Sequence, residues 1–300
     1  MNRREFLKSA VVTGAALTVP PVLGLLAGSL EAAGRPDLCV ARGSSPAASV
    51  RAVLDGIGGI GRFVSRGDIV VVKPNIGWDR TPEYAANTNP EVVAAVVALC
   101  IEAGAKKVKV FDHPVSDARR TYRQSGIAEA AAAAAAEVSF TDDRKFREMR
   151  IGGNTLKVWS LYTEAVEADK LINIPIAKVH GTSRLTLGMK NLMGVMGGWR
   201  GRIHQRIDES LVDLAAFVKP SLVILDAVRI LTANGPQGGD LRDVKRLNMI
   251  VAGADQVAVD AFGATLFGLK PADLGYVRIG QQAGLGKMDL EKLSIRKIDL

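Results

Sequence analysis

The chain has 300 residues, of which 48% are hydrophobic and 23% charged, and its formal net charge is +8 at pH 7. This composition excludes a disordered chain and suffices for one large or two small domains. Aromatic residues make up only 5% of the chain, too few for broad stacking surfaces on single-stranded nucleic acid. We expect no nucleic-acid partner, while the positive charge suits an anionic small molecule.

The N-terminal residues have the pattern of an export signal. Arg3 and Arg4 precede a moderately apolar stretch over residues 10–26, which two prolines interrupt, and small residues follow. A charged region, an apolar region and a cleavage-like region in this order predict that residues 1–33 are a twin-arginine signal peptide. The chain would then reach the periplasm through the twin-arginine export machinery, with residues 34–300 as a single mature domain. Retention of the segment as an N-terminal membrane anchor stays open, because it has no clean Ala-x-Ala site.

The cysteines argue against a metal cluster built by this chain alone. Cys39 and Cys100 are the only cysteines, and they form no Cys-x-x-Cys motif. Two thiolates cannot supply the four ligands of an iron–sulfur cluster or a structural zinc. We predict two buried free thiols, with a periplasmic disulfide as the alternative.

Short β-branched runs alternate with helical patterns along the mature chain. Alternating strands and helices favour an α/β domain with a mostly parallel sheet and helices on both faces. The predicted elements, in chain order, are strand 68–75, helix 90–104, strand 107–112, helix 127–136, strand 170–175, helix 209–218, strand 221–226, strand 247–253 and helix 255–267.

Polar residues follow the predicted strands where a ligand would bind. In open α/β sheets, ligands sit beyond the carboxyl ends of the strands. We therefore expect one site to gather the side chains that follow four of these strands, namely Lys73 and Asn75, Asp112 and His113, Lys178 and His180, and Asp226 with the loop residues Asn234 and Gly235.

A basic, glycine-rich segment suggests an anion as the ligand. Residues 177–198 contain five glycines and no acidic residue. Glycines allow the backbone to approach a phosphate or carboxylate, and lysines supply positive charge. The segment has no Walker motif, and a solvated basic loop is the alternative. We predict that an anionic substrate or phosphate-bearing cofactor binds to Lys73, Asn75, Lys178, Asn191, Asn234 and Gly235.

The three histidines and one lysine are candidates for chemistry. His180 would be the acid–base group or a metal ligand, with His204 as its partner. Lys190 is a third catalytic candidate, because a desolvated lysine amine can form a Schiff base. A divalent metal is a further possibility, with His113 and the carboxylates of Asp112 and Asp226 as ligands, although their spacing is not diagnostic.

Several ordered motifs resemble a known family. They are "VVVKPNIG", "NTNPEVVAAVVALCIEAGAKKVKVFDHP", "ADKLINIPIAKVHGTSRLTLGMKNLMG", "NGPQGG" and "ADQVAVDAFGATLFGL", which together cover about residues 69–286. In this order they resemble the domain-of-unknown-function family 362, which has no settled activity. Many relatives carry a ferredoxin-type cysteine module or are described as iron–sulfur proteins. This chain lacks those cysteines, so the resemblance does not imply an intrinsic iron–sulfur cluster.

The resemblance points to the same residues as the strand ends. The family pattern includes Lys73-Pro74-Asn75, Lys178 with His180, Lys190-Asn191, His204 and Asn234-Gly235-Pro236. It also includes Asp255, which could cap a helix, and Asp260, which would point inward from that helix.

Three functions are compatible with these patterns. The first is an exported enzyme, redox or isomerase-like, that binds an anionic small molecule or cofactor. The second is a periplasmic binding or cofactor-delivery protein that uses the same cleft without chemistry. The third is a partner subunit of a separate iron–sulfur protein. A pair of acid–base groups with shifted pKa values in the cleft would favour the enzyme.

Overall fold

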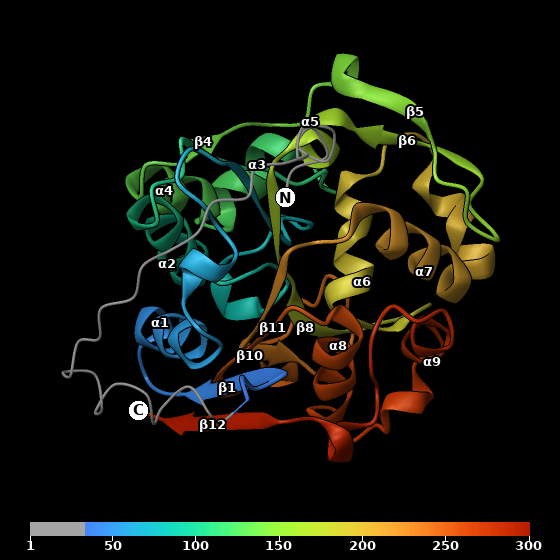
Figure 1. Ribbon diagram of the computed structural model, residues 1–300. Helices are drawn as coiled ribbons and strands as arrows, with labels where there is room; N and C mark the ends of the chain where they lie inside the picture. The colour runs from blue at the N-terminus through green and yellow to red at the C-terminus, as the bar shows by residue number, and fades with distance from the viewer. Residues whose placement is uncertain (1–33) are drawn as a thin grey trace, which may run out of the picture. The chain divides into compact units, whose positions relative to one another are not determined.

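A mixed, mostly parallel ten-stranded sheet forms the centre of the molecule (Figure 1). The computed structural model describes residues 34–300, so the predicted signal segment lies outside the described residues. The strand order is β12 (Ile295–Asp299), β1 (Leu38–Arg42), β11 (Val244–Gly253), β10 (Leu222–Leu231), β7 (Lys170–Ile174), β2 (Ile69–Pro74), β3 (Lys107–Val110) and β4 (Glu137–Val138). Off this path, β8 (Ile176–His180) pairs with β10, and β9 (Arg184–Thr186) pairs with β8.

The strands around the site are parallel, as the sequence predicts. β2 lies between β3 and β7 with both pairs parallel, and β10 is parallel to β7 and β8. Antiparallel pairing occurs at β11, which joins β10 to β1, and between β8 and β9. The carboxyl ends of β2, β3, β7 and β8 therefore meet at one edge of the sheet.

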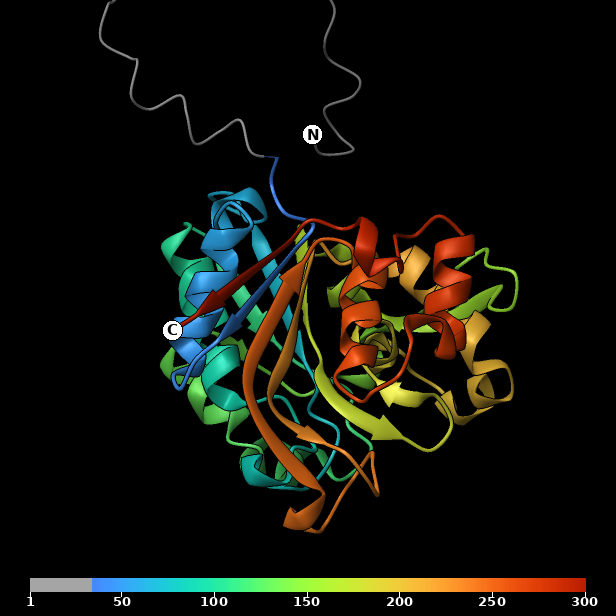
Figure 2. The ribbon, with the colours of Figure 1, turned by 90° about the horizontal axis from the view of Figure 1, so that it is seen from below.

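Helices cover both faces of the sheet, which confirms the predicted α/β class (Figure 2). Strand side chains alternate between the faces: Val70 and Val72 join one apolar core, and Val71 joins the other. The helices of the first core are α1 (Pro46–Gly56), α2 (Pro90–Glu102), α3 (Ala118–Gln124) and α4 (Ile127–Ala133). Those of the second are α5 (Thr163–Glu167), α6 (Gly188–Asn191), α7 (Ile207–Val218), α8 (Gln256–Thr265) and α9 (Gly275–Gln282).

Local sequence signals account for the helix ends. Asn89 caps α2 by accepting a hydrogen bond from the Glu91 backbone N–H, and Pro90 occupies the first turn, where its missing N–H costs nothing. Asp255 caps α8 by accepting from Ala258 N–H at 2.9 Å. Residues 35–300 form one compact unit, in which no helix combines the length and apolar character of a membrane span.

The structure extends the predicted elements and revises one segment. The basic segment 177–198, for which a solvated loop was the alternative, consists largely of β8, β9, α6 and the 3-10 helix η4 (Leu192–Val195). β10 continues to Leu231, so Asp226 lies in the middle of a strand and not at its end. Cys39 and Cys100 are buried and free, which confirms the predicted pair of free thiols.

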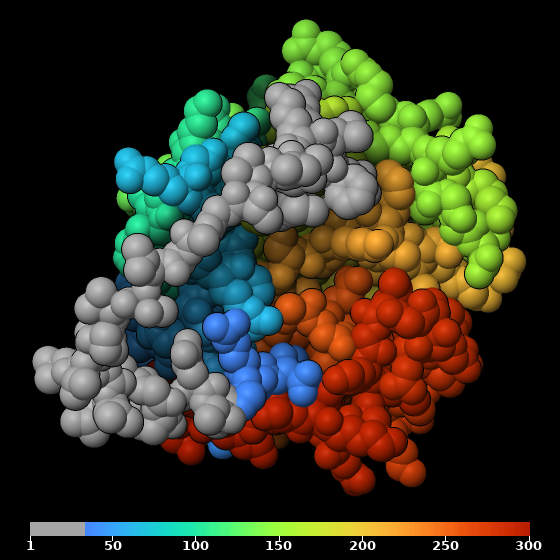
Figure 3. Space-filling view, viewed as in Figure 1, coloured from blue at the N-terminus to red at the C-terminus, as the bar shows by residue number. Residues whose placement is uncertain are grey.

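A separate hairpin supports the segment that follows α6. It consists of β5 (Phe146–Arg150) and β6 (Val158–Tyr162), and its residues form the light-green rim in Figure 3. The Gly197 N–H donates to Ser160 O at 2.8 Å, and the Trp159 indole donates to Gly197 O at 3.0 Å. A Cβ at Gly197 would come within 2.6 Å of the Phe146 ring, so this close contact requires glycine.

Candidate functional site

A buried ion pair joins the ends of β2 and β3. Lys73 Nζ lies 2.7 Å from Asp112 Oδ1, and both side chains are almost fully buried. Lys73 also donates to Pro74 O, while the Ile76 N–H donates to Asp112 Oδ2 at 2.6 Å. Gly194 packs directly on this pair, because a Cβ there would lie 1.7 Å from Asp112 Oδ1. Burial lowers the pKa of Lys73 and the Asp112 carboxylate opposes that shift, so the pair is satisfied internally.

A chain of side-chain amides connects the end of β2 and strand β7 to α6. Asn75 Nδ2 donates to Asn191 Oδ1, Asn191 Nδ2 donates to Asn173 Oδ1, and Asn173 Nδ2 donates to Gly188 O, each at 2.8 Å. Asn173 is fully buried and absent from the sequence-based site. Its signal in the sequence is an amide inside the otherwise apolar strand "KLINIP", since a buried amide requires hydrogen-bond partners.

The start of α6 is fixed by a carboxylate from α8. Asp260 accepts hydrogen bonds from the Gly188 N–H at 2.6 Å and the Met189 N–H at 2.9 Å. Its side chain points inward as the sequence suggests, and burial raises the pKa of this carboxyl to about 7. The Asp260 carboxyl thus fixes the first turn of α6 and with it the two residues that follow, Lys190 and Asn191.

Two buried lysines, Lys178 and Lys190, have no carboxylate partner among residues 34–300. Lys178 Nζ donates to Asn75 Oδ1 at 3.0 Å and to Ala86 O. Burial and the nearby charge of Lys190 lower the pKa of Lys178 to about 7. Burial and the charge of Arg200 lower the pKa of Lys190 to about 8.

The rings of His180 and His204 are stacked, and their Nδ1 atoms have opposite hydrogen-bonding roles, an acceptor in His180 and a donor in His204. Their rings are 6.0 Å apart between centroids and 12° from parallel. His180 Nδ1 accepts from the Thr182 N–H at 3.2 Å, so its neutral ring carries the proton on Nε2. His204 Nδ1 lies 3.2 Å from Gly201 O, an oxygen that only accepts, so its neutral ring leaves Nε2 unprotonated.

Both imidazoles are held in the neutral form. Burial, with the charges of Lys190 and Lys178, lowers the pKa of His180 to about 3. Burial and the charge of Lys190 also lower the pKa of His204. The stacked pair therefore offers one Nε2–H hydrogen-bond donor and one basic Nε2 acceptor at neutral pH.

These residues line a cavity of about 490 Å³, named here the cation-lined cavity. It lies at the carboxyl edge of the sheet, between the strand ends, α6, and the segment of the 3-10 helix η5 (Arg200–Arg206). Its charged lining residues are Lys178, Lys190, Arg200 and Asp112, and the last is already paired with Lys73. Trp199, 75% exposed, lies at its edge.

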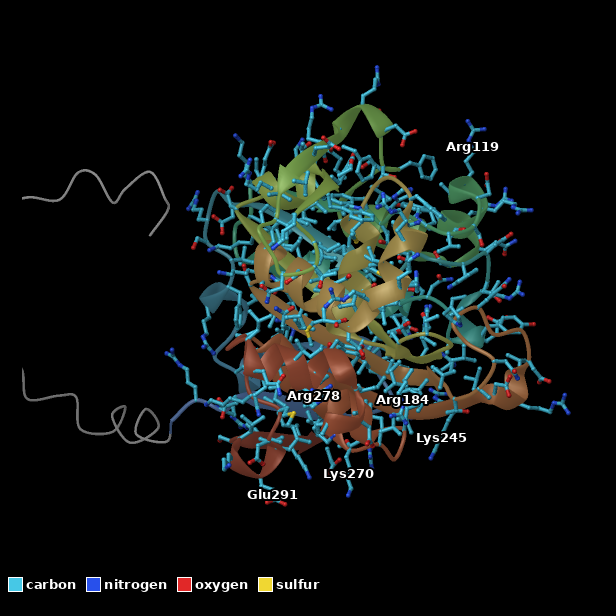
Figure 4. The ribbon with its side chains drawn as sticks, turned by 90° about the vertical axis from the view of Figure 1, so that its right-hand side faces the viewer. Arg119, Arg184, Lys245, Lys270, Arg278 and Glu291 are labelled. Atoms are coloured by element: carbon cyan, nitrogen blue, oxygen red, sulfur yellow. The ribbon has the colours of Figure 1, made fainter. Side chains whose placement is uncertain are left out.

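Arg200 is a site residue that sequence analysis missed. Its guanidinium donates to His113 O at 2.8 Å and to Pro114 O at 2.9 Å, which anchors η5 to the end of β3. Burial lowers the pKa of this side chain. By contrast, Arg119, Lys245 and Lys270 are exposed at the surface (Figure 4), so the charge inside the cavity is not part of the general surface excess.

Of the nine residues predicted for catalysis or anion binding, six come together in the cation-lined cavity and three do not line it. The six are Asn75, Lys178, His180, Lys190, Asn191 and His204. Lys73 is occupied by its pair with Asp112. Asn234 instead donates to Asp243 Oδ2 at 2.8 Å. Gly235 packs on β8, where a Cβ would lie 2.2 Å from Val179 O. The structure therefore gives these three residues partners of their own and does not place them in the lining of the cavity.

The predicted metal ligands are not assembled. Residues 34–300 hold no group of three His, Cys, Asp or Glu side chains placed to bind a metal. Asp112 and His113 line the cation-lined cavity, but Asp226 is buried inside β10 and accepts from the Asn89 and Val228 N–H groups. Burial raises the pKa of Asp226 to about 6. A metal shared by these three residues is thus not supported.

Fold and site together define an α/β protein with a cation-lined cavity at the carboxyl edge of its sheet. Residues 70–265 match the model of the family described as "Domain of unknown function (DUF362)". A thylakoid-associated protein of Synechocystis sp. is 33% identical over 253 residues, which cover 79% of this chain and 75% of that protein. The chain belongs to the DUF362 family.

Two solved structures align with much of the chain at low identity. The lactate racemase apoprotein from Thermoanaerobacterium thermosaccharolyticum aligns with a TM-score of 0.49 and 13% identity, over 77% of this chain and 57% of that one. A Thermotoga maritima protein aligns with a TM-score of 0.39 and 10% identity, over 80% and 60%. The chain thus spans about three fifths of either structure.

Proposed function

We propose that this protein is an enzyme that binds a small anion in the cation-lined cavity and transfers a proton on it. The observation that carries the proposal is the charge inside the cavity. Lys178, Lys190 and Arg200 all have lowered pKa values, and the one lining carboxylate is already paired. Desolvated cations without counter-ions are costly, so a bound carboxylate, phosphate or sulfate would stabilise them.

The stacked histidines favour an enzyme over a carrier. A binding protein needs donors for the anion, and the lysines and Arg200 supply them. It has no need of two neutral imidazoles with complementary Nε2 atoms, which His180 and His204 present. In the proposed reaction, His204 Nε2 accepts a proton from the bound molecule and returns it from the resulting imidazolium ion, while His180 Nε2–H donates a hydrogen bond to the oxygen on which charge develops, an isomerase-like exchange.

Sulfate is the sharpest probe of the binding step, because its own charge is constant near neutral pH. Isothermal titration calorimetry between pH 6 and pH 9, in buffers of different ionisation enthalpy, would measure affinity and proton uptake. Sulfate should raise the pKa values of Lys178 and Lys190, so binding should take up protons at pH 8 and almost none at pH 6. Sulfate binding without proton uptake, or no binding at pH 6, would contradict the proposal.

The proton-transfer step has its own measurement. A panel of small carboxylates and phosphate esters would be incubated with the protein in D₂O, and loss of carbon-bound protons followed by NMR. His180→Gln and His204→Gln should each slow exchange of a responsive compound by roughly 10²–10⁴-fold, with sulfate affinity largely retained. If both variants exchanged protons as fast as the unmodified protein, a binding protein would explain the site better than an enzyme.

Export through the twin-arginine route is part of the proposal and rests on Arg3 and Arg4. Replacing both by lysine should leave the precursor in the cytoplasm, since the export route reads the arginine pair. Cell fractionation followed by immunoblotting would locate the protein. Mature protein outside the cytoplasm in the double variant would contradict this route.

A further inference from the structure

The three buried lysines at this edge of the sheet differ in what their amines contact. Lys73 meets a carboxylate and a carbonyl oxygen, and Lys178 meets an amide oxygen and a carbonyl oxygen. Lys190 Nζ has one polar contact among residues 34–300, the Met193 sulfur at 3.0 Å. A thioether is a weak acceptor, so this amine is buried in the cavity wall without an oxygen partner.

This environment favours the neutral amine. An ammonium without oxygen acceptors is poorly stabilised when buried, and the Arg200 cation adds repulsion. The amine therefore keeps a free lone pair for a larger fraction of the time than an exposed lysine does. Lys178 is a poorer nucleophile despite its own burial, because attack would break its bonds to Asn75 and Ala86.

The groups around Lys190 suit a covalent step. Lys178 and Arg200 remain to hold a carboxylate or phosphate in the same cavity. Lys190, His180 and His204 line the same cavity, so a molecule bound to Lys190 would lie beside the two imidazoles.

We propose that Lys190 forms an imine with the carbonyl carbon of a small anion that carries an aldehyde or ketone group. This deepens the proposed function and rests on it. The Nζ lone pair forms the carbon–nitrogen bond, while the carbonyl π pair moves to oxygen, which accepts a hydrogen bond from His180 Nε2–H. His204 Nε2 accepts a proton from the attacking nitrogen and passes it to this oxygen, which gives a neutral carbinolamine. A proton from solvent then lets the hydroxyl leave as water, and the nitrogen lone pair forms the carbon–nitrogen double bond of the iminium ion.

Reductive trapping with glyoxylate tests this assignment, since glyoxylate carries one aldehyde and one carboxylate. The full protein would be treated with glyoxylate and sodium cyanoborohydride at pH 7, and modified lysines mapped by peptide mass spectrometry. From the neutral fractions at a pKa of about 8 and at an ordinary lysine pKa, Lys190 should react on the order of a hundredfold faster than exposed Lys245 or Lys270. Acetaldehyde should show a smaller preference than glyoxylate, because it shares the effect of the lowered pKa but has no carboxylate for Lys178 and Arg200 to hold.

Lys190→Arg is the matched variant, because it keeps the cation and removes the nucleophile. It should bind sulfate and lose the fast adduct. If that variant fails to fold, protection of Lys190 by sulfate in the unmodified protein decides instead. Sulfate binding without preferential labelling of Lys190, or preferential labelling of Lys178, would overturn the imine and leave the anion-binding function standing. Absence of sulfate binding would overturn both.

Discussion

The two halves of the carboxyl edge use the same residue type in opposite ways. At the ends of β2 and β3, Lys73 is buried against Asp112 and its charge is matched inside the protein. Across the cation-lined cavity, on β8 and α6, Lys178 and Lys190 are buried without a carboxylate. A matched charge stabilises the fold once it is in place, whereas an unmatched charge is stabilised when a ligand arrives. The partner, and not the burial, separates a structural lysine from a candidate binding lysine.

The largest expected effect comes from breaking the matched pair. Asp112→Ala leaves Lys73 buried without a counter-ion, and it should lower the free energy of unfolding by about 3–5 kcal/mol. Urea denaturation followed by circular dichroism would measure it. Arg51→Ala is the control, because the Arg51–Glu102 pair is more than half exposed and should contribute at most about 1 kcal/mol. Similar losses in the two variants would remove the distinction between buried and exposed pairs.

Lys178, which has no carboxylate partner among residues 34–300, should lower the free energy of unfolding, and the size of this effect should depend on pH. Because the pKa of Lys178 is lowered to about 7, the unfolded chain binds more protons than the native protein between about pH 7 and pH 10. Its contribution to stability therefore rises with pH in that window and is most unfavourable below pH 7.

Lys178→Met removes this contribution while keeping an apolar stem of similar length. The gain in stability of the variant over the unmodified protein should shrink by about 2–3 kcal/mol between pH 6 and pH 9. Urea denaturation at the two pH values would measure the difference. The same gain in stability at both pH values would show that the pKa of Lys178 is not lowered, and would contradict the interpretation of Lys178 as an unmatched buried charge.

The affinity for the anion should depend on Lys178 and Lys190, which have no carboxylate partner among the described residues, and not on exposed cations. Lys178→Ala removes a charged hydrogen bond to the anion, which typically costs roughly 1.5–3 kcal/mol, or a loss of sulfate affinity of about tenfold to hundredfold. Calorimetric titration at pH 6 would measure it. Arg119→Ala is a suitable control, since Arg119 is exposed and does not line the cation-lined cavity. Equal losses in both variants would indicate general charge attraction.

The smallest effect tests the correction made to the sequence-based site. Asn234 lies outside the cation-lined cavity and hydrogen-bonds to Asp243 in an exposed loop. Asn234→Ala should leave sulfate affinity unchanged and alter the free energy of unfolding by at most about 1 kcal/mol. Calorimetry and urea denaturation on the same sample would measure both. A clear loss of affinity would return this loop to the site.

Periodicity and strand ends carried the sequence-based prediction where local signals were strong. The pattern Pro90 to Gly104 gave α2 with its Asn89 cap, and the β-branched run 69–72 gave β2. Parallel strands then brought Asn75, Lys178 and His180 to one edge, as the topology rule requires. Features that depend on neighbouring residues in the sequence were therefore predictable.

Pairing was not predictable from the sequence. Nothing in the sequence distinguishes Lys73 from Lys178, because the difference lies in whether a carboxylate from another strand reaches the amine. Asp226 was misplaced because β10 continues for five residues beyond it as an antiparallel arm with β11, and tertiary pairing decides that length. Arg200 was missed because its partners are backbone carbonyls of the β3 end, which no motif reports.

The position of β1 has a consequence for how the chain acquires its fold. This strand, residues 38–42, pairs with β11 and β12, and the Ser294 N–H donates to Asp37 across 257 residues of sequence. During synthesis, β1 emerges early and stays unpaired, because more than 200 residues separate it from β11 and still more from β12. Loops this long make closure slow and leave an unpaired strand edge exposed in the meantime. We therefore expect the nascent chain to complete its sheet only once β12 has been synthesised.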